Sequence, residues 1–195
     1  MTKIFPLSES HKIGLFGNHK KQNTTDLLKI SEIKNLWIYQ VVSYKVISAN
    51  IDKIFIDGHK LPMISGDVSG DYTTRIHWNA PNTWTVISSN ENIINQILEN
   101  CSEDDFAITD QSHSRVIIQI EGQKSFEIIK KGSPLNLNNF KKNNCASSVY
   151  HGMTISIDMI DDNPIKFNLM ALRSFSESFY HAITDSALEY GYQNL

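Results

Sequence analysis

The chain has 195 residues and a formal net charge of −3. That length is enough to bury a core of ordinary size and divides into one or two domains. With 41% hydrophobic and 20% charged residues, the composition is typical of globular proteins rather than disordered ones. The negative balance lacks the positive field that sequence-independent nucleic-acid binding requires, so we expect no nucleic-acid partner.

The cysteine content and the absence of long apolar runs predict a cytoplasmic protein. Cys101 and Cys145 lie too far apart in sequence to form a thioredoxin or zinc-ribbon pair, which indicates reduced thiols. Residues 1–6 do not begin an apolar run with a cleavage site. No later segment approaches the roughly 18 apolar residues that span a bilayer. We therefore expect neither secretion nor membrane insertion.

The first 35 residues are polar and weakly patterned. Gly14, Gly17 and the run 22–25 interrupt any hydrophobic period. Residues 1–35 are accordingly interpreted as a mobile N-terminal arm that orders only against a partner.

Residues 36–109 contain the elements of a ferredoxin-like half. They are a β-branched and aromatic strand at 36–46, a brief helix at 51–56, strands at 73–78 and 83–88, a helix at 93–98 and a short strand at 106–108. The turn 79–82 has hairpin length, and Ser89 or Asn90 is the expected cap of the helix. The order strand, helix, two strands, helix, strand is the ferredoxin-like pattern.

Residues 110–195 are expected to form a second half of the same kind with a C-terminal helix. The elements are a strand at 116–120, a helix at 123–131, strands at 146–150, 154–159 and 165–170, and a helix at 174–190. Gly132 and Gly191 are positioned to end the two helices in the left-handed conformation. Ser174 and Glu177 have the spacing of a capping box. The predicted fold class is therefore α+β.

Few residues have the arrangement that chemistry requires. His113 lies between Ser112 and Ser114, but neighbours in an extended segment point to opposite faces, which favours a structural or interface role. The segment from Asp110 to His113 is expected to satisfy backbone groups where the halves join. Arg173 either grips a carboxylate with two hydrogen bonds or packs its stem on a neighbouring ring.

Metal, nucleotide and flavin motifs are not legible in the sequence. The remaining histidines show no i, i+4 pair and no cysteine at ligand spacing. The block from Gly14 to Gly17 lacks the rest of a phosphate-binding loop. Trp37, Trp78 and Trp84 lie on predicted strands as either core or contact residues. We thus assign no catalytic, cofactor-binding or metal residue, and we name His113, Arg115 and Arg173 as interface or structural candidates.

Four blocks of sequence carry a family resemblance. Asp110-Gln111-Ser112-His113-Ser114-Arg115, Lys131-Gly132-Ser133-Pro134-Leu135-Asn136-Leu137, Leu172-Arg173-Ser174-Phe175-Ser176-Glu177-Ser178-Phe179 and Glu189-Tyr190-Gly191 resemble the gamma subunit of heterotetrameric sarcosine oxidase. The chain departs from that pattern at Gln111, Ser133, Asn136, Ser176 and Tyr190. Ser133 stands in place of a cysteine and Asn136 in place of an aspartate, which weakens any chemical role for that loop.

The resemblance implies a fold related to the folate-binding glycine-cleavage aminomethyltransferase, in agreement with two halves. It also implies partners, the alpha, beta and delta subunits, in a complex that oxidatively demethylates sarcosine to glycine. FAD, covalently held FMN, NAD and tetrahydrofolate would belong to those partner subunits, and this chain would supply structure. Two alternatives stay open. One is a folate-binding aminomethyltransferase-like protein, and the other is an iron–sulfur-associated folate-binding relative, whose motif shares only Lys131 and Gly132 with this chain.

Overall fold

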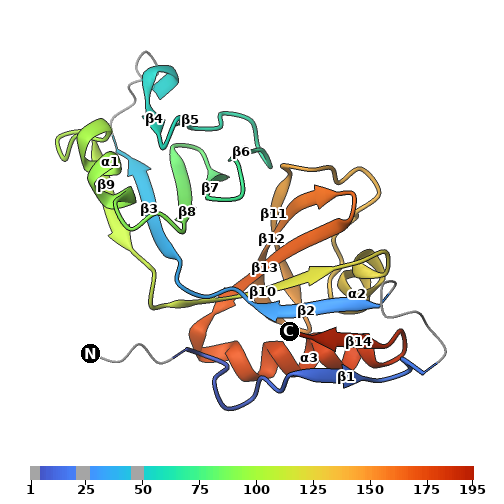
Figure 1. Ribbon diagram of the computed structural model, residues 1–195. Coiled ribbons are helices and arrows are strands. Elements are labelled where there is room, and N and C mark those ends of the chain that lie inside the picture. Colours follow the sequence, from blue (N-terminus) through green and yellow to red (C-terminus); the bar gives the residue numbers. More distant parts are fainter. Residues whose placement is uncertain (1–4, 21–26, 45–50) are drawn as a thin grey trace. The chain divides into compact units, whose positions relative to one another are not determined.

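The computed structural model describes residues 5–20, 27–44 and 51–195, which divide into two compact units (Figure 1). Unit 1 comprises residues 1–34, 114–142 and 147–195, and unit 2 comprises residues 35–113 and 143–146. The chain passes between the units after Lys34 and after His113, and residues 143–146 belong to unit 2 as well.

Unit 2 is built on a five-stranded sheet with the order β6-β7-β8-β3-β9. Its neighbouring strands pair in antiparallel fashion. The elements are β3 (Trp37–Ser43), the 3-10 turn η1 (Ile51–Lys53), β4 (Phe55–Ile56), β5 (His59–Lys60), β6 (Val68–Gly70), β7 (Thr74–Ala80), β8 (Thr83–Ser88), α1 (Ile93–Asn100) and β9 (Phe106–Asp110). β4 and β5 form a separate two-stranded ribbon.

The expected strands of unit 2 are present, but β4, β5 and β6 were not expected, since residues 51–56 were interpreted as a brief helix and residues 58–71 as a loop. The hairpin of β7 and β8 is confirmed, with Asn82 at a φ of 58° in the turn. The brief helix expected at 51–56 is a single 3-10 turn that leads into β4. α1 begins after Asn92 without a side-chain cap, because the Ser88 and Asn90 side chains accept N–H groups of the preceding turn instead.

The core of unit 2 lies between the sheet and α1. Ile93 and Ile97 of α1 are fully buried against a cluster that includes Val41 and Trp84. The indole of Trp84 also donates to the Pro62 carbonyl oxygen at 2.7 Å. A buried indole needs a partner for its N–H, so this contact fixes both the ring and the loop over it.

Unit 1 is built on a seven-stranded sheet with the order β1-β14-β2-β10-β13-β12-β11. Its strands are β1 (Gly14–Phe16), β2 (Leu28–Glu32), β10 (Arg115–Glu121), β11 (Cys145–Tyr150), β12 (Met153–Asp162), β13 (Ile165–Leu172) and β14 (Tyr192–Asn194). The helical elements are α2 (Ser125–Gly132), the 3-10 turn η2 (Arg173–Phe175) and α3 (Ser176–Leu188). The β12–β13 hairpin expected from alternation is confirmed. Among the described residues, no helix is long and apolar enough to cross a membrane.

The N-terminal segment is part of this sheet, so the expectation of an arm over residues 1–35 is wrong for its described residues. β2 pairs with β10 on one side and with β14 on the other. Leu7, Leu28 and Ile30 are at most 2% exposed in the core of unit 1. The alternation of apolar and polar residues over Leu28-Lys29-Ile30-Ser31 is short. Leu28 and Ile30 become buried only when strands distant in sequence pair with β2, so the local pattern alone does not predict the strand.

Of the two glycines expected to end helices, one acts as predicted and the other does not. Gly191 adopts a φ of 72° after α3, as predicted for a helix stop. Gly132 is instead the last residue of α2 and is needed for space: a Cβ there would lie 2.6 Å from the Tyr150 ring. The Tyr150 hydroxyl donates to the Ile128 carbonyl oxygen at 3.0 Å and lies 2.9 Å from Oγ of Ser186.

The capping box expected at Ser174 does not form. The chain tightens into η2, and α3 begins at Ser176 with no side-chain cap. Glu177 accepts a hydrogen bond from Oγ of Ser10 at 3.0 Å rather than from the start of the helix. The Glu177 carboxylate thus binds a residue 167 positions away in sequence instead of the backbone at the start of its own helix.

Gly132→Ala tests the close approach of α2 to Tyr150. Helix propensity alone favours Ala over Gly by up to about 1 kcal/mol. We expect the opposite sign, a loss of about 1–3 kcal/mol of unfolding free energy, because the added methyl overpacks a ring that is fully buried. Urea denaturation measures the difference. In a Tyr150→Val background the same change should become neutral or stabilising; an equal loss there would contradict the steric explanation.

Candidate functional site

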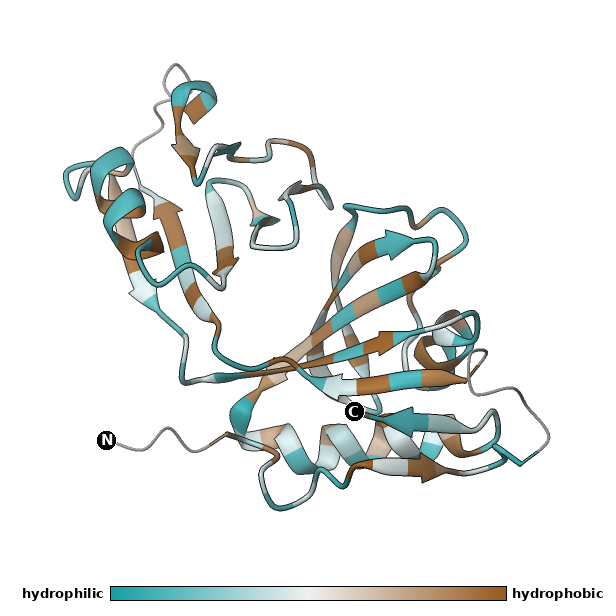
Figure 2. Ribbon diagram, in the orientation of Figure 1, coloured by the Kyte–Doolittle hydropathy of each residue, from teal (hydrophilic) through white to brown (hydrophobic). Residues whose placement is uncertain are grey.

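The strands of unit 1 separate apolar and polar side chains onto two faces of the sheet. Bands of opposite hydropathy alternate along β2 and β10 in Figure 2. One face packs against α2 and α3 through residues such as Ile30, Ile118 and Leu169. The opposite face, here called the polar sheet face, consists chiefly of Lys29, Ser31, Arg115, Gln119, Glu121, Asp158, Asp161, Lys166 and Asn168.

A row of alternating charge crosses one end of the polar sheet face. The two carboxylate oxygens of Glu121 bind Lys29 Nζ at 2.9 Å and Lys166 Nζ at 2.8 Å. Lys166 lies opposite Asp161 in the register, and Asp161 binds Lys142 Nζ at 3.4 Å. The hydrogen bonds from Lys166 and Lys29 lower the pKa of Glu121. Glu121 therefore stays ionised at neutral pH, as a structural anion rather than a proton donor.

The next row across the same strands is polar and largely uncharged. Ser31, Gln119, Asn168 and Asp158 lie opposite one another on β2, β10, β13 and β12. The Gln119 amide donates to the Asn168 side-chain oxygen at 2.9 Å. Asp158 is 2% exposed, which is unusual for a carboxylate, since buried charges are normally retained only with partners.

The predicted candidates Arg115 and Arg173 meet at the other end of the face. Arg115 begins β10 and pairs with Leu172 of β13 in the register. Arg173, the residue after Leu172, donates its backbone N–H to the Ser114 carbonyl oxygen at 2.8 Å. Both arginine side chains are half-buried, and burial lowers the pKa of Arg115. Leu172 and Phe175 beside them are about two-fifths exposed. Cations flanked by exposed apolar side chains are typical of contact surfaces.

His113 lies in an exposed turn at the end of unit 2. The preceding residues satisfy backbone groups, as predicted: the Asp110 carboxylate accepts the Ser112 N–H at 2.8 Å, and the Ser112 hydroxyl accepts the Ile38 N–H at 2.9 Å. The Ser112 hydroxyl is thus engaged with the backbone of β3, which leaves it no role as a nucleophile.

The loop after α2 is structural. Oγ of Ser133 lies 2.7 Å from Oγ of Ser148 and accepts the Leu135 N–H at 3.3 Å. The Asn136 side chain accepts the Asn138 N–H at 3.0 Å, as a short polar turn residue does. The serine and asparagine that depart from the family pattern therefore close turns.

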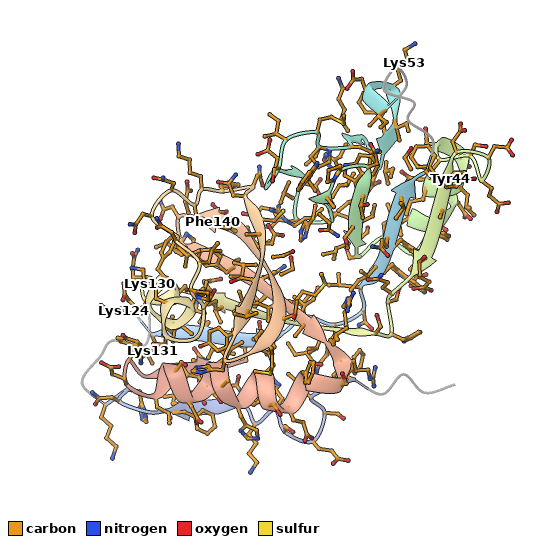
Figure 3. All side chains as sticks on the ribbon, turned by 180° about the vertical axis from the view of Figure 1, so that it is seen from behind. Tyr44, Lys53, Lys124, Lys130, Lys131 and Phe140 are labelled. Carbon is orange, nitrogen blue, oxygen red and sulfur yellow. The ribbon has the colours of Figure 1, made fainter. Side chains whose placement is uncertain are left out.

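A shallow depression of about 450 Å³ lies beside α2 and α3, lined by Lys131, His151, Ala182, Asp185 and Ser186. Lys131 and the other labelled lysines of this region gather along α2 in Figure 3. The Lys131 ammonium is already bound, to the Ser186 carbonyl oxygen at 2.8 Å and to Glu189 at 2.7 Å. It also lies 4.5 Å from the centre of the Tyr190 ring. Because the Lys131 ammonium is engaged in this way, the depression is poorly suited to bind an anion.

The polar and thiol groups of the described residues were compared with the requirements of a metal site and of a reactive thiol. No group of three or more His, Cys, Asp or Glu in them is arranged to hold a metal ion. Burial raises the pKa of the Cys101 thiol to about 11, so it is protonated and unreactive at neutral pH. In the polar cluster around Glu121, each of the two carboxylate oxygens already binds a lysine.

The polar sheet face was not found by sequence reasoning. Lys29 falls in the segment taken for an arm, and its partner Glu121 is 92 residues away. The alternation Leu28-Lys29-Ile30-Ser31-Glu32 is the sequence pattern that indicates this face. The same two-residue period that buries Leu28 and Ile30 places Lys29 and Ser31 on the other face of the sheet.

Comparison with known proteins identifies the fold of the chain but shows no family. No family model matches the chain, and no curated protein matches it. Among solved structures, it is similar to a chain of heterotetrameric sarcosine oxidase from Corynebacterium sp. U-96, solved in complex with pyrrole 2-carboxylate. The TM-score is 0.76 at 17% identity, over 84% of this chain and 85% of that one. It is also similar to the glycine cleavage system aminomethyltransferase T from Bartonella henselae, with a TM-score of 0.63 at 11% identity. That match covers 93% of this chain and 56% of the other. The chain thus has a mixed α/β fold similar to the aminomethyltransferase-like fold.

Glu121→Gln tests the charge row. We expect a loss of about 1 kcal/mol of unfolding free energy at pH 7, because the two lysines lose their anion. A carboxyl with a lowered folded pKa stabilises the protein above its ordinary pKa of 4.5, and that stability is lost as the pH falls through the folded value. The difference from wild type should therefore shrink below pH 4.5.

Urea denaturation at pH 7, 5 and 3 gives the comparison. Glu127→Gln is the matched control: its pair with Lys130 spans 3.2 Å, but both side chains are about 45% exposed, so we expect a change near zero. Equal losses for the two variants, or a loss for Glu121→Gln that persists at pH 3, would contradict the assignment.

Proposed function

We propose that this chain is a non-catalytic subunit, equivalent to the gamma subunit, of a heterotetrameric complex that oxidatively demethylates sarcosine to glycine. The observation that carries the proposal is the likeness to a chain of heterotetrameric sarcosine oxidase over more than four-fifths of both chains. The likeness therefore spans most of both chains rather than one shared segment. The engaged polar groups of the described residues support a structural role rather than a catalytic one.

The proposed partners are the alpha, beta and delta subunits, and the proposed location is the cytoplasm. Arg115, Arg173 and His113 are the proposed contact residues. Arg115 and Arg173 lie together with the exposed Leu172 and Phe175 at one end of unit 1, and His113 is exposed at the end of unit 2. Arginine beside apolar surface is a frequent anchor in protein interfaces, because its planar cation can bind a carboxylate while its stem packs.

We assign FAD, FMN, NAD and tetrahydrofolate to the partner subunits. Gly14 and Gly17 do not fit a dinucleotide, because Gly14 begins β1, which pairs with β14, and no helix follows Gly17 in the described residues before β2. A phosphate-binding loop needs backbone N–H groups at the start of a helix. This segment uses its backbone in a sheet instead.

We further infer that the two units correspond to two ferredoxin-like halves. In unit 2 the order β7-β8-β3-β9 is that of the ferredoxin-like sheet, with η1 in place of the first helix. In unit 1 the corresponding order is β12-β13-β10-β14, with β2 inserted between β10 and β14. The inserted strand accounts for the departure of unit 1 from a simple repeat.

The second candidate is a folate-binding aminomethyltransferase-like protein. It is favoured by the match of 93% of this chain to the glycine cleavage system aminomethyltransferase T. This function requires tetrahydrofolate binding by the isolated chain, which quenching of intrinsic tryptophan fluorescence would detect. Saturable binding would favour this candidate over the structural role.

The first test of the subunit proposal is assembly. Co-expressed with alpha, beta and delta subunits of a heterotetrameric sarcosine oxidase, the chain should copurify as one species through size exclusion in equal molar amount. Purified alone, it should be colourless and should not oxidise sarcosine. A chain that elutes as a monomer in the presence of all three partners would refute the proposal.

The second test separates assembly from chemistry. In the assembled complex, His113→Ala should lower the yield or thermal stability of the complex while turnover per intact complex stays within about twofold. Loss of a general acid or base would instead lower turnover by about a hundredfold or more. A fully assembled complex with that loss would overturn the structural role. His181→Ala changes another exposed histidine, on α3; it is the matched control and should change neither quantity.

A further inference from the structure

The outer edge of unit 2 has an open strand beside an apolar groove. β9 is the terminal strand of the five-stranded sheet, and among the described residues only β3 pairs with it. A groove of about 510 Å³ lies along it, lined by Tyr39, Ile94, Leu98, Glu103, Phe106, Ala107, Ile108 and Asp110. Its walls are α1, the loop after α1, and β9 itself.

The register shows which backbone groups of β9 face outward. Gln111 donates to the Ile38 carbonyl oxygen at 2.7 Å, and Tyr44 donates to the Asp105 carbonyl oxygen at 3.2 Å, so the odd-numbered residues of β9 bind β3. In an antiparallel pair the alternate residues point the other way. Ile108, in the middle of β9, therefore directs its N–H and C=O toward the open edge, while its side chain lines the groove.

The groove is apolar in its middle and acidic at both ends. Leu98 is 46% exposed and Phe106 forms part of the floor. Glu103 precedes β9 and Asp110 ends it, and both side chains line the groove. The pKa of Tyr39 is raised by burial and by the Asp110 carboxylate, so its phenol stays neutral at physiological pH.

The surrounding sequence strengthens this negative potential. Residues 76–114 contain no Lys or Arg, although the whole chain has a net charge of only −3. The acidic residues of that segment are Glu91, Glu99, Glu103, Asp104, Asp105 and Asp110. A segment of this charge attracts cations and repels acidic surfaces.

We propose that β9 and the groove beside it form a docking site for an extended segment of a partner protein, which adds a strand to the edge of unit 2. The segment would place alternate apolar side chains in the groove against Leu98 and Phe106. Lysine or arginine at its two ends would meet Glu103 and Asp110. Backbone hydrogen bonds to Ile108 supply affinity in this mode of binding, and the alternating pockets supply specificity.

Alternatives to a bound strand are less compatible with these features. An acidic or nucleic-acid ligand would be repelled by Glu103 and Asp110. An exposed edge strand also promotes self-association, which charged side chains suppress. A second copy of β9 would bring Asp110 and its acidic neighbours against themselves, so a basic segment of a different protein is the better occupant.

The test uses two labelled peptides of identical composition and charge. Lys-Thr-Val-Thr-Ile-Thr-Lys, blocked at both ends, places its apolar residues centrally on one face with lysines at the ends. Val-Thr-Lys-Thr-Lys-Thr-Ile exchanges those positions. Fluorescence anisotropy with the full chain should show binding of the first peptide that is about tenfold tighter or more than binding of the second. Equal binding, or no binding of the first peptide, overturns the proposal.

Three variants locate the site. Leu98→Ala should weaken binding of the first peptide about fivefold or more, whereas Leu188→Ala, an equally exposed leucine in unit 1, should leave it within about twofold. Glu103→Lys should weaken it about tenfold, and Glu9→Lys, the same charge change in unit 1, much less. Ile108→Pro removes the outward N–H and should abolish binding.

Thermal unfolding of each variant establishes that it is folded. Because Leu98 is half exposed, we expect Leu98→Ala to leave the core intact. Its binding measurement therefore tests the site even if Ile108→Pro unfolds. Undiminished binding by Leu98→Ala and Glu103→Lys would refute the site. The peptide assay requires no oxidase subunit, so its outcome is independent of the proposed function.

Discussion

The pairing of β2 on both sides is the constraint on which unit 1 depends. Lys29 to Glu32 pair with β10 in antiparallel fashion, and Leu28 to Ile30 pair with β14 in parallel fashion. Without β2, both neighbours would become edges with unpaired backbone groups, and each such group is costly when buried. Leu28 and Ile30 would also leave the core that α3 covers. A segment remote in sequence from both strands therefore joins β10 to β14.

The same pairing determines which side chains appear on each face. Because side chains alternate, a slip of one residue in β2 would move Leu28 and Ile30 out of the core and Lys29 into it. The bonds of Lys29 and Lys166 to the two oxygens of Glu121 form only in the observed register. The charge row thus specifies the alignment of three strands while the core supplies most of their stability. Ion pairs that are partly buried contribute modest net energy, but a register that breaks them leaves charges without their partners.

Local patterns were sufficient where the partner of a residue lies nearby in sequence. The hairpins β7–β8 and β12–β13 follow from alternation and turn residues alone, and the helix stop at Gly191 follows from glycine chemistry. Three of the failures involve distant partners, whereas the missing cap of α1 reflects local bonds of Ser88 and Asn90. β2 depends on β10 and β14, Gly132 on the Tyr150 ring, and Glu177 on Ser10. The saturated pairs of the polar sheet face are likewise formed between strands that no local pattern brings together.

The uneven distribution of charge gives the chain a means of recognising partners without a catalytic group. The segment 76–114 carries six acidic and no basic residues, so the remainder of the chain carries a net charge of +3. A partner with the opposite pattern would be attracted in one orientation and repelled in others, and such complementarity acts on association rate and specificity more than on affinity. Exposed leucine and phenylalanine beside Arg173 in unit 1, and Leu98 beside Glu103 in unit 2, then provide apolar contact area. In such a complex, charge selects the orientation of the two surfaces and apolar burial stabilises it.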